Sequence, residues 1–329
     1  MTTQDNDQPK WSQETIMSLS RAFMESRVLL TGTELDLFTL AASAPVSARE
    51  IAGRIGADLR ALTIVLDALA AMGLMIKKDD AYRTEPSAAR LLAANGPESI
   101  LPIIRHSVDL WERWGRLTGK VAGPRTPDAP MSAFIGAMHA IARPLAPRIV
   151  ALVNPAGARR LLDVGGGSGS YTLAFLEAAP EMRATIFDLP QVIEMARERV
   201  GAAGMLERVT LVPGDFRTDP LPGGHDLAFV SAIIHQNSPA ENVMMFRKIF
   251  AALSPGGRIV VRDHILSPDR TEPRPGALFA VNMLVGTEAG NSYTEAEIRE
   301  TLTEAGFTGI RVIHPDMRMD GLVEAFRPR

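Results

Sequence analysis

The second half of the chain alternates short apolar runs with helical segments, and no other feature constrains the fold as strongly. Apolar strands separated by helices are typical of a parallel sheet whose two faces are both covered. We therefore predict an α/β fold with a mostly parallel, doubly wound sheet. Ligands bind such sheets beyond the carboxyl ends of the strands, near the point where the strand order reverses. The expected strands, all after residue 158, are RRLLDVG, RATIFDLP, RVTLVPGDF, HDLAFVSAII and GRIVVRDHIL.

A glycine-rich loop, DVGGGSG, spans residues 163–169 at the end of the first expected strand. Glycine lets the backbone approach a ligand closely and adopt positive φ. In a GxGxxG dinucleotide fingerprint the third glycine would fall at Ser170 or Thr172, so the spacing disfavours a nicotinamide- or flavin-dependent oxidoreductase. The lack of a GxxxxGK(S/T) loop disfavours a nucleotide triphosphatase. The candidate binding residues of the loop are Asp163, Gly165, Gly167 and Gly169.

The second and third expected strands also end in acids. Asp188, followed by Leu189, lies about 20 residues beyond the glycines, a spacing that suits hydrogen bonds to ribose hydroxyls. The third strand ends in Gly214, Asp215 and Phe216, which offer a polar contact and an aromatic wall for an adenine ring. An acid at one strand end is often only a cap. Three such motifs in order predict a cofactor site at this edge of the sheet.

The N-terminal half is predominantly helical in pattern. Residues 12–40 predict two helices separated at Gly32. Residues 46–92 predict a helix–turn–helix followed by a hairpin at 75–83, which is a winged-helix outline. Its second helix is apolar on most faces and carries Arg60 as its only basic residue, so a packing or dimerisation module is favoured over a DNA reader.

Composition excludes several function classes. The formal net charge is −3, which disfavours a protein held to nucleic acid by phosphate contacts. The chain has no cysteine, so it has no disulfide framework, thiol nucleophile or iron–sulfur site. No apolar run reaches the length of a membrane span, and the polar first residues lack a secretory signal. We therefore expect a cytoplasmic protein that binds neither nucleic acid nor a membrane.

We expect three segments along the chain. Residues 1–10 predict a disordered tail, 11–155 a helical domain with the winged-helix outline, and 156–329 the cofactor-binding domain. The stretch at 123–130, rich in proline, predicts the clearest loop or linker of the chain.

Taken together, these motifs resemble the S-adenosylmethionine-dependent small-molecule O-methyltransferases of the caffeate and hydroxyindole type, including their bacterial secondary-metabolism relatives. The resemblance covers nearly the whole chain. It implies a Rossmann-like class I methyltransferase domain preceded by a winged-helix dimerisation domain, a homodimer, S-adenosyl-L-methionine as cofactor and a small-molecule acceptor. It rests on DVGGGSG, FDLP, GDF, the histidine after the fourth strand, SPGGRIVVRD and TEAEIRETLTEAGF.

The resemblance also assigns cofactor contacts. It places Gly165, Gly167 and Asp188 against the cofactor, with Asp215 and Phe216 near the adenine. A further candidate is Ser231, which occupies the position where many members have a lysine near the adenosine.

His235, at the end of the fourth expected strand, is the candidate general base, because an imidazole suits proton removal near neutral pH. The family usually has His-Asp-Trp here, where this chain has His-Gln-Asn; the alternative is a histidine that only caps the next helix. By resemblance Asp263 orients the base, one methylene shorter than the usual glutamate. The second orienting acid falls near Ser292, which is not an acid. The other histidines lack metal-ligand spacing, and His264 could line the site.

The acceptor pocket is expected to involve four residues. Phe134 and Met138 match a family FxxAM segment, and Asn282 and Met283 lie on a helix that returns toward the site. Phenylalanine and methionine at helical spacing are equally consistent with a core role. An amide within the apolar run LFAVNMLV needs a hydrogen-bond partner, which the acceptor or His235 would supply.

Three alternatives remain beside an O-methyltransferase. A sulfur acceptor needs less help from a base, so the missing second acid makes an S-methyltransferase the runner-up. Transfer to nitrogen or carbon is possible on the same scaffold. A cofactor-sensing winged-helix regulator would bind DNA without turnover, and the apolar second helix counts against it.

Overall fold

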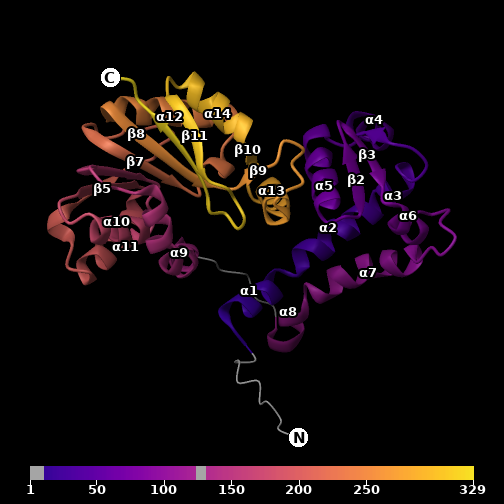
Figure 1. Cartoon of the computed structure of the whole chain (residues 1–329). Coiled ribbons are helices and arrows are strands. Elements are labelled where there is room, and N and C mark those ends of the chain that lie inside the picture. Colours follow the sequence, from indigo (N-terminus) through magenta and orange to yellow (C-terminus); the bar gives the residue numbers. More distant parts are fainter. Residues whose placement is uncertain (1–10, 124–130) are drawn as a thin grey trace, which may run out of the picture. The chain divides into compact units, whose positions relative to one another are not determined.

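The computed structural model describes residues 11–123 and 131–329, which form two compact units divided after Gly123 (Figure 1). The expected tail at 1–10 and most of the expected linker lie outside the described residues. We expected the domain boundary after residue 155. The division lies earlier because the long helix α9 (Met131–Val153) buries Ile149, Val150 and Val153 in the core of the C-terminal unit.

The N-terminal unit is mostly helical with a small antiparallel sheet in the order β1-β3-β2. The predicted pair of helices and the hairpin both form, as α4, α5 and β2–β3. Its elements are α1 (Gln13–Arg21), α2 (Phe23–Glu34), α3 (Leu37–Leu40), β1 (Val46–Ser47), α4 (Ala48–Ile55), α5 (Leu59–Ala71), β2 (Met75–Lys78), β3 (Ala81–Thr84), α6 (Pro86–Leu92), α7 (Leu101–Trp114) and α8 (Leu117–Ala122).

Helix α5 lies at the centre of this unit. Leu66 and Leu69 are fully buried, and the buried Asp67 carboxylate accepts hydrogen bonds from Lys77 Nζ and the Tyr82 hydroxyl, each at 2.6 Å. A buried acid is stable in a core only with such partners. The burial of α5 agrees with the packing role that its apolar pattern predicts.

The expected break at Gly32 is wrong, because α2 runs through this residue. A Cβ atom at Gly32 would lie 3.0 Å from the Phe38 ring, so the glycine serves close packing. The chain instead turns after Glu34, where Asp36 adopts a positive φ of 55°.

The C-terminal unit is built on a seven-stranded sheet in the order β11-β12-β8-β7-β4-β5-β6. Strands β6, β5, β4, β7 and β8 are parallel, and β12 is antiparallel to both of its neighbours. The order reverses between β4 and β7, which confirms the doubly wound α/β prediction. The strands are β4 (Arg160–Val164), β5 (Arg183–Asp188), β6 (Val209–Pro213), β7 (His225–Ser231), β8 (Leu253–Asp263), β11 (Thr308–His314) and β12 (Gly321–Phe326).

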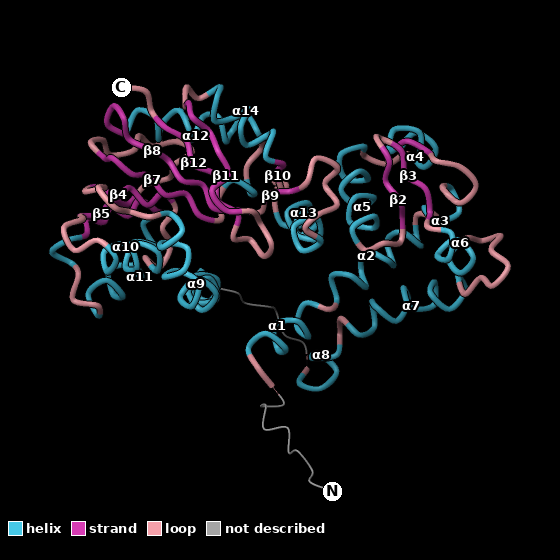
Figure 2. The backbone as a smooth tube through the Cα atoms, viewed as in Figure 1, coloured by secondary structure: helices cyan, strands magenta, loops and turns pink. Residues whose placement is uncertain are grey.

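Helices cover both faces of this sheet (Figures 1 and 2). One hydrophobic core joins the sheet to α9, α10 and α11, and the other joins it to α12 and α14. A short parallel pair, β9–β10, lies beyond the end of β8. The remaining elements are α10 (Ser170–Ala178), α11 (Pro190–Ala202), η1 (Leu206–Arg208), η2 (Ile234–Gln236), α12 (Pro239–Ala252), β9 (Ile265–Leu266), α13 (Arg274–Gly286), β10 (Tyr293–Thr294) and α14 (Glu295–Glu304).

Across residues 11–123 and 131–329, no helix combines the length and apolar character needed to cross a membrane.

Candidate active site

The glycine loop joins β4 to α10 at the point where the strand order reverses. Gly165, Gly167 and Gly169 all adopt positive φ, at 67°, 57° and 77°. These are backbone conformations that other residues adopt only with strain. A Cβ atom at Gly165 would also overlap the side chain of Ile233, which follows β7. The loop therefore requires glycine here for both its conformation and its close packing.

Asp188 fixes the shape of this loop. Its Oδ2 accepts from the Gly167 amide at 2.8 Å, and its Oδ1 accepts from the Leu189 amide at 2.7 Å. Each carboxylate oxygen can accept a second hydrogen bond. Burial raises the pKa of Asp188 despite these two bonds. The acid predicted to bind ribose hydroxyls thus lies directly against the predicted glycine loop.

Asp163 lies beneath the loop and is 1% exposed. Its Oδ2 accepts from the Thr172 hydroxyl at 2.6 Å. Burial is the main cause that raises the pKa of Asp163 to about 7; the Thr172 hydrogen bond opposes the shift and the charge of Asp188 adds to it. Asp163 therefore contributes to the site from below, by supporting the loop.

We expect Asp163→Asn to stabilise the ligand-free protein above neutral pH. From about pH 4, where an aspartate ordinarily ionises, the unfolded chain releases this proton while the folded chain keeps it, so wild-type stability falls up to about pH 7. A shift of this size corresponds to roughly 4 kcal/mol. The neutral amide avoids that loss. Chemical unfolding at pH 4 and pH 8 measures this. The free energy of unfolding of the variant should exceed that of the wild type at pH 8, and this advantage should be absent at pH 4.

Asp215→Asn provides a control of opposite sign, because hydrogen bonds from Arg217 lower the pKa of this half-buried acid. Its replacement should cost stability at neutral pH and lose that effect in acid. An Asp163→Asn effect equal at both pH values would contradict the assignment of a proton to Asp163.

The adenine side of the predicted site is formed by the turn after β6. A Cβ atom at Gly214 would lie 2.5 Å from the Phe187 ring, so only glycine fits between β5 and this turn. Asp215 forms an ion pair with Arg217 at 2.7 Å, and the neighbouring Phe216 is half-buried. The predicted Asp215 contact is therefore already engaged by a cation of the same turn.

His235 and Asp263 form a hydrogen-bonded pair at the ends of β7 and β8. His235 Nδ1 lies 2.9 Å from each carboxylate oxygen of Asp263. Burial alone would raise the pKa of Asp263, but the charges of His235 and His264 and their hydrogen bonds outweigh it, so the pKa lies below its ordinary value. An ionised carboxylate only accepts hydrogen bonds, so Nδ1 is the donor, and in the neutral form of the imidazole the lone pair is then on Nε2.

The histidine is also held by its surroundings. The His235 ring meets the Phe279 ring edge-on at 4.8 Å, and its backbone carbonyl accepts from the Asn291 amide at 2.8 Å. Asn237, which stands where the resembling family has tryptophan, is buried and donates to Asn242 Oδ1 at 3.0 Å. The unusual His-Gln-Asn triplet is thus anchored to α12 through its third residue.

The remaining predicted residues are less directly placed. Ser292 is buried and donates to the Gly276 carbonyl at 2.8 Å, which ties β10 to α13. Phe134 and Met138 are exposed on α9. Met283 is buried, whereas Asn282 is exposed on α13. Solvent can therefore satisfy the amide that we expected to need a partner.

Sequence reasoning missed two side chains at this edge. His139 of α9 contacts the glycine loop through Ser170 Oγ at 2.8 Å and Ser168 Oγ at 3.2 Å. Arg262 of β8 donates to Ser231 Oγ at 2.9 Å. The one available signal was a charged residue within the otherwise apolar strand GRIVVRD. His264, which we expected to line the site, is buried and pairs with Asp316 at 2.6 Å.

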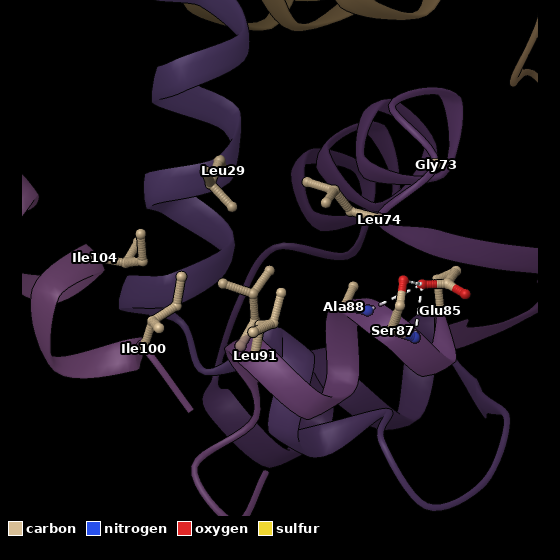
Figure 3. A pocket seen from close by; sticks show the side chains of 10 residues that line it. Leu29, Gly73, Leu74, Glu85, Ser87, Ala88, Leu91, Ile100 and Ile104 are labelled. Atoms are coloured by element: carbon tan, nitrogen blue, oxygen red, sulfur yellow. Dashed lines mark hydrogen bonds between the residues drawn. The ribbon is translucent and has the colours of Figure 1, made fainter. Parts of the chain in front are cut away.

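A separate pocket of about 280 Å³ lies within the N-terminal unit (Figure 3). Leu29, Leu74, Leu91 and Ile104 line it, and its walls are predominantly apolar. The one acid in its wall, Glu85, accepts hydrogen bonds from the first turn of α6. This pocket offers a hydrophobic surface and no group placed for acid–base chemistry.

Family models match both parts of the chain. One, described as an O-methyltransferase domain, matches residues 125–308, and another, an O-methyltransferase dimerisation domain, matches residues 17–94. The start of the first match agrees with the observed division at Gly123 rather than with the expected boundary after residue 155.

Individual relatives are similar over nearly their whole length. A tetracenomycin polyketide synthesis 8-O-methyl transferase of Streptomyces glaucescens is 33% identical, over 90% of this chain and 91% of that protein. A 3-hydroxy-5-methyl-1-naphthoate 3-O-methyltransferase of Streptomyces sahachiroi is 30% identical, over 91% and 90%. The crystal structure of an O-methyltransferase family 2 protein from Planctomyces limnophilus, in complex with apigenin, superposes with a TM-score of 0.82 at 25% identity, covering 97% of each chain.

Proposed function

This chain belongs to the O-methyltransferase family, and from that premise we propose that it methylates a phenolic hydroxyl of a fused-ring aromatic acceptor, with His235 as the general base. The observation that carries the proposal is the His235–Asp263 pair at the carboxyl edge of the sheet, beside the glycine loop. The missing second acid was the reason to weigh a sulfur acceptor. An intact pair at 2.9 Å supports proton removal, which a hydroxyl acceptor needs and a thioether does not.

We assign S-adenosyl-L-methionine as the cofactor; it supplies a methyl group already activated by a positively charged sulfur. The residues at the edge fit its adenosine half. Asp188 has acceptor capacity for the ribose, and Phe216 follows the bend at Gly214, whose amide donates to the Asp188 carbonyl at 2.9 Å. The assigned cofactor residues are Asp163, Gly165, Gly167, Gly169, Asp188, Leu189, Gly214, Asp215, Phe216 and Ser231.

Because the methyl group is already activated, the protein's own groups need only remove the hydroxyl proton and align the acceptor. Asp263 holds Nδ1 of His235, so that Nε2 is the nitrogen that takes the hydroxyl proton. The negative charge of Asp263 stabilises the imidazolium that results. Phe279 restricts the ring to one orientation. Phe134, Met138, Asn282 and Met283 are the proposed acceptor contacts, and alignment of the acceptor contributes as much as the base does.

Names of relatives guide the choice of acceptor. One relative is named for a hydroxynaphthoate, another for a tetracenomycin polyketide, and a solved relative holds apigenin. We therefore propose to measure S-adenosylhomocysteine release with apigenin, a hydroxynaphthoate and a naphthalenethiol. Release with the phenols and formation of their methyl ethers is expected. Release with the thiol alone would replace this proposal by S-methylation.

We also propose a homodimer formed through the N-terminal unit. The dimerisation-domain match covers residues 17–94, and helix α1 buries none of its side chains within one chain. Ile16 and Leu19 are 49% and 63% exposed on this amphipathic helix. An apolar stripe of this kind is typical of a surface that another subunit covers.

The double substitution Ile16→Asp, Leu19→Asp should weaken the dimer by roughly 100-fold or more, because each side chain is replaced in both subunits and each burial is worth about 1.5–3 kcal/mol. Sedimentation velocity at several concentrations measures this. Leu206→Asp, at an exposed leucine of the C-terminal unit, is the matched control and should leave association unchanged. A double variant that dimerises like the wild type would place the interface elsewhere.

A further inference from the structure

Arg262 is a buried cation without an acid partner. Its side chain, near the end of β8, is in a residue only 4% exposed. Within residues 11–123 and 131–329, the structure gives it one hydrogen bond, from Nη1 to Ser231 Oγ at 2.9 Å, and no carboxylate within ion-pair distance. Its Nε is buried without any hydrogen-bond partner. Buried charges in proteins are ordinarily paired, so this guanidinium has unused capacity for an anion.

Another arginine of the same strand shows the ordinary arrangement. Arg258 forms an ion pair with the buried Glu324 and donates to the carbonyls of Val153 and Asn154. The contrast is between two arginines on one face of one strand. Arg258 is paired with an acid within the protein, and Arg262, nearer the carboxyl end of β8 where ligands are expected, is not paired with one in the described residues.

The immediate neighbours of Arg262 also supply hydrogen-bond donors. The guanidinium carbon lies 5.3 Å from the centre of the Tyr171 ring. The Tyr171 hydroxyl is buried, and Ser231 and Arg262 are its polar neighbours. Arg262, Ser231 and Tyr171 therefore bring together several N–H and O–H groups, and the acid whose charge acts on Tyr171, Asp163, has a pKa raised by burial to about 7. This is the inventory expected of a subsite for a carboxylate.

The position of the cluster relates it to the glycine loop. Ser231 and Arg262 are register partners at the carboxyl ends of β7 and β8, and Tyr171 is in the first turn of α10, directly after the loop. Side chains alternate along a strand, so Arg262 points to the α9–α11 face while Asp263 points to the opposite face with His235. The cluster and the base thus lie on opposite sides of the same edge.

We infer that Arg262, with Ser231 and Tyr171, forms the subsite for the α-carboxylate at the methionine end of the cofactor. The inference rests on the proposed methyltransferase function. For methyl transfer the sulfonium of the cofactor would have to face the acceptor and His235, and Arg262, Ser231 and Tyr171 would then be the residues that hold its amino-acid end. A carboxylate on the far side of the loop neutralises the guanidinium and accepts from the two hydroxyls. Arg262 acts on cofactor binding and takes no part in proton removal.

Binding of two product-like probes tests this inference directly. S-adenosylhomocysteine carries the α-carboxylate, whereas 5′-methylthioadenosine shares the adenosine and sulfur but lacks the amino-acid end. Isothermal titration should show that Arg262→Met weakens S-adenosylhomocysteine by roughly 10- to 100-fold, the loss of charge-assisted hydrogen bonds. The affinity of 5′-methylthioadenosine should change less than twofold. Arg262→Lys should recover part of the lost affinity, because it keeps the charge without the fork of donors.

Stability and a matched control separate binding from folding. The ligand-free Arg262→Met protein should melt no lower than the wild type, since an unpaired buried charge has been removed. Arg258→Met should melt lower but keep the wild-type ratio of the two affinities. Equal weakening of both probes by Arg262→Met would assign Arg262 a purely structural role. Unchanged affinities with a raised KM for a carboxylate-bearing acceptor would assign the anion to the acceptor. Either result overturns the inference.

The binding and melting outcomes do not depend on turnover. If the wild type binds neither probe, the assignment of the cofactor itself fails, and the proposed function fails with it. If the wild type binds both probes and only the Arg262 variants behave unexpectedly, the carboxylate subsite alone is wrong.

Discussion

His235→Ala should lower kcat for a phenolic acceptor by about 10²- to 10⁴-fold, the range that a positioned general base contributes. The substitution removes the Nε2 that takes the proton and leaves the alignment groups in place. S-adenosylhomocysteine affinity should stay within a few-fold of the wild type, because the glycine loop and Asp188 do not contact the imidazole in the described structure. Steady-state kinetics with isothermal titration on the same preparation measures both quantities.

His314→Ala is the control for loss of a histidine from the same unit. His314 contacts Arg148 and Asp320 rather than Asp263, so its removal should change kcat by less than threefold. A His235→Ala protein that binds the product normally and turns over at the wild-type rate would reduce His235 to a wall of the pocket.

Asp263→Asn should lower kcat by roughly 10- to 10³-fold with little change in KM. The amide keeps the shape of the carboxylate but loses the negative charge that stabilises a protonated imidazole. Its NH2 group is a donor, so in one of its two orientations it no longer accepts the hydrogen bond that orients Nδ1. Asp263→Glu retains the charge and should recover most of the rate. The measurement is kcat for all three proteins at saturating cofactor and acceptor.

A drop shared by Asp263→Asn and Asp263→Glu, together with a lower melting temperature, would indicate damage to the end of β8. A kcat that does not respond to the loss of the carboxylate would contradict its role as the orienting acid.

Local patterns predicted the sheet and the cofactor edge because both are encoded within short segments. The glycine loop, Asp188 and the turn at Gly214 lie where parallel strands end, and parallel strands necessarily end at one edge. The His235–Asp263 pair was reached through resemblance, and the sheet register explains it, since β7 and β8 are neighbours. These features need only the order of the strands to be correct.

Features that depend on packing between distant segments escaped prediction. Gly32 in the sequence predicts a helix break, and only the structure shows that Phe38 packs against it. The length of α9 suited either domain, and only its contacts assign it to the C-terminal unit. Asn282 needed a partner only if its helix face were buried, and it is exposed. Arg262 stood in the sequence as an ordinary charge, and only the structure of residues 11–123 and 131–329 shows that its Nε is buried without a hydrogen-bond partner there.

The most direct test of base-assisted methyl transfer is a single-turnover comparison of the wild type and His235→Ala across phenols of graded acidity. A phenol that is already ionised needs no base, whereas a weakly acidic phenol needs one fully. With His235 as the base, the rate penalty of His235→Ala should shrink steadily as the acceptor becomes more acidic and nearly vanish for a nitrophenol. An equal penalty for every acceptor would contradict proton removal by His235.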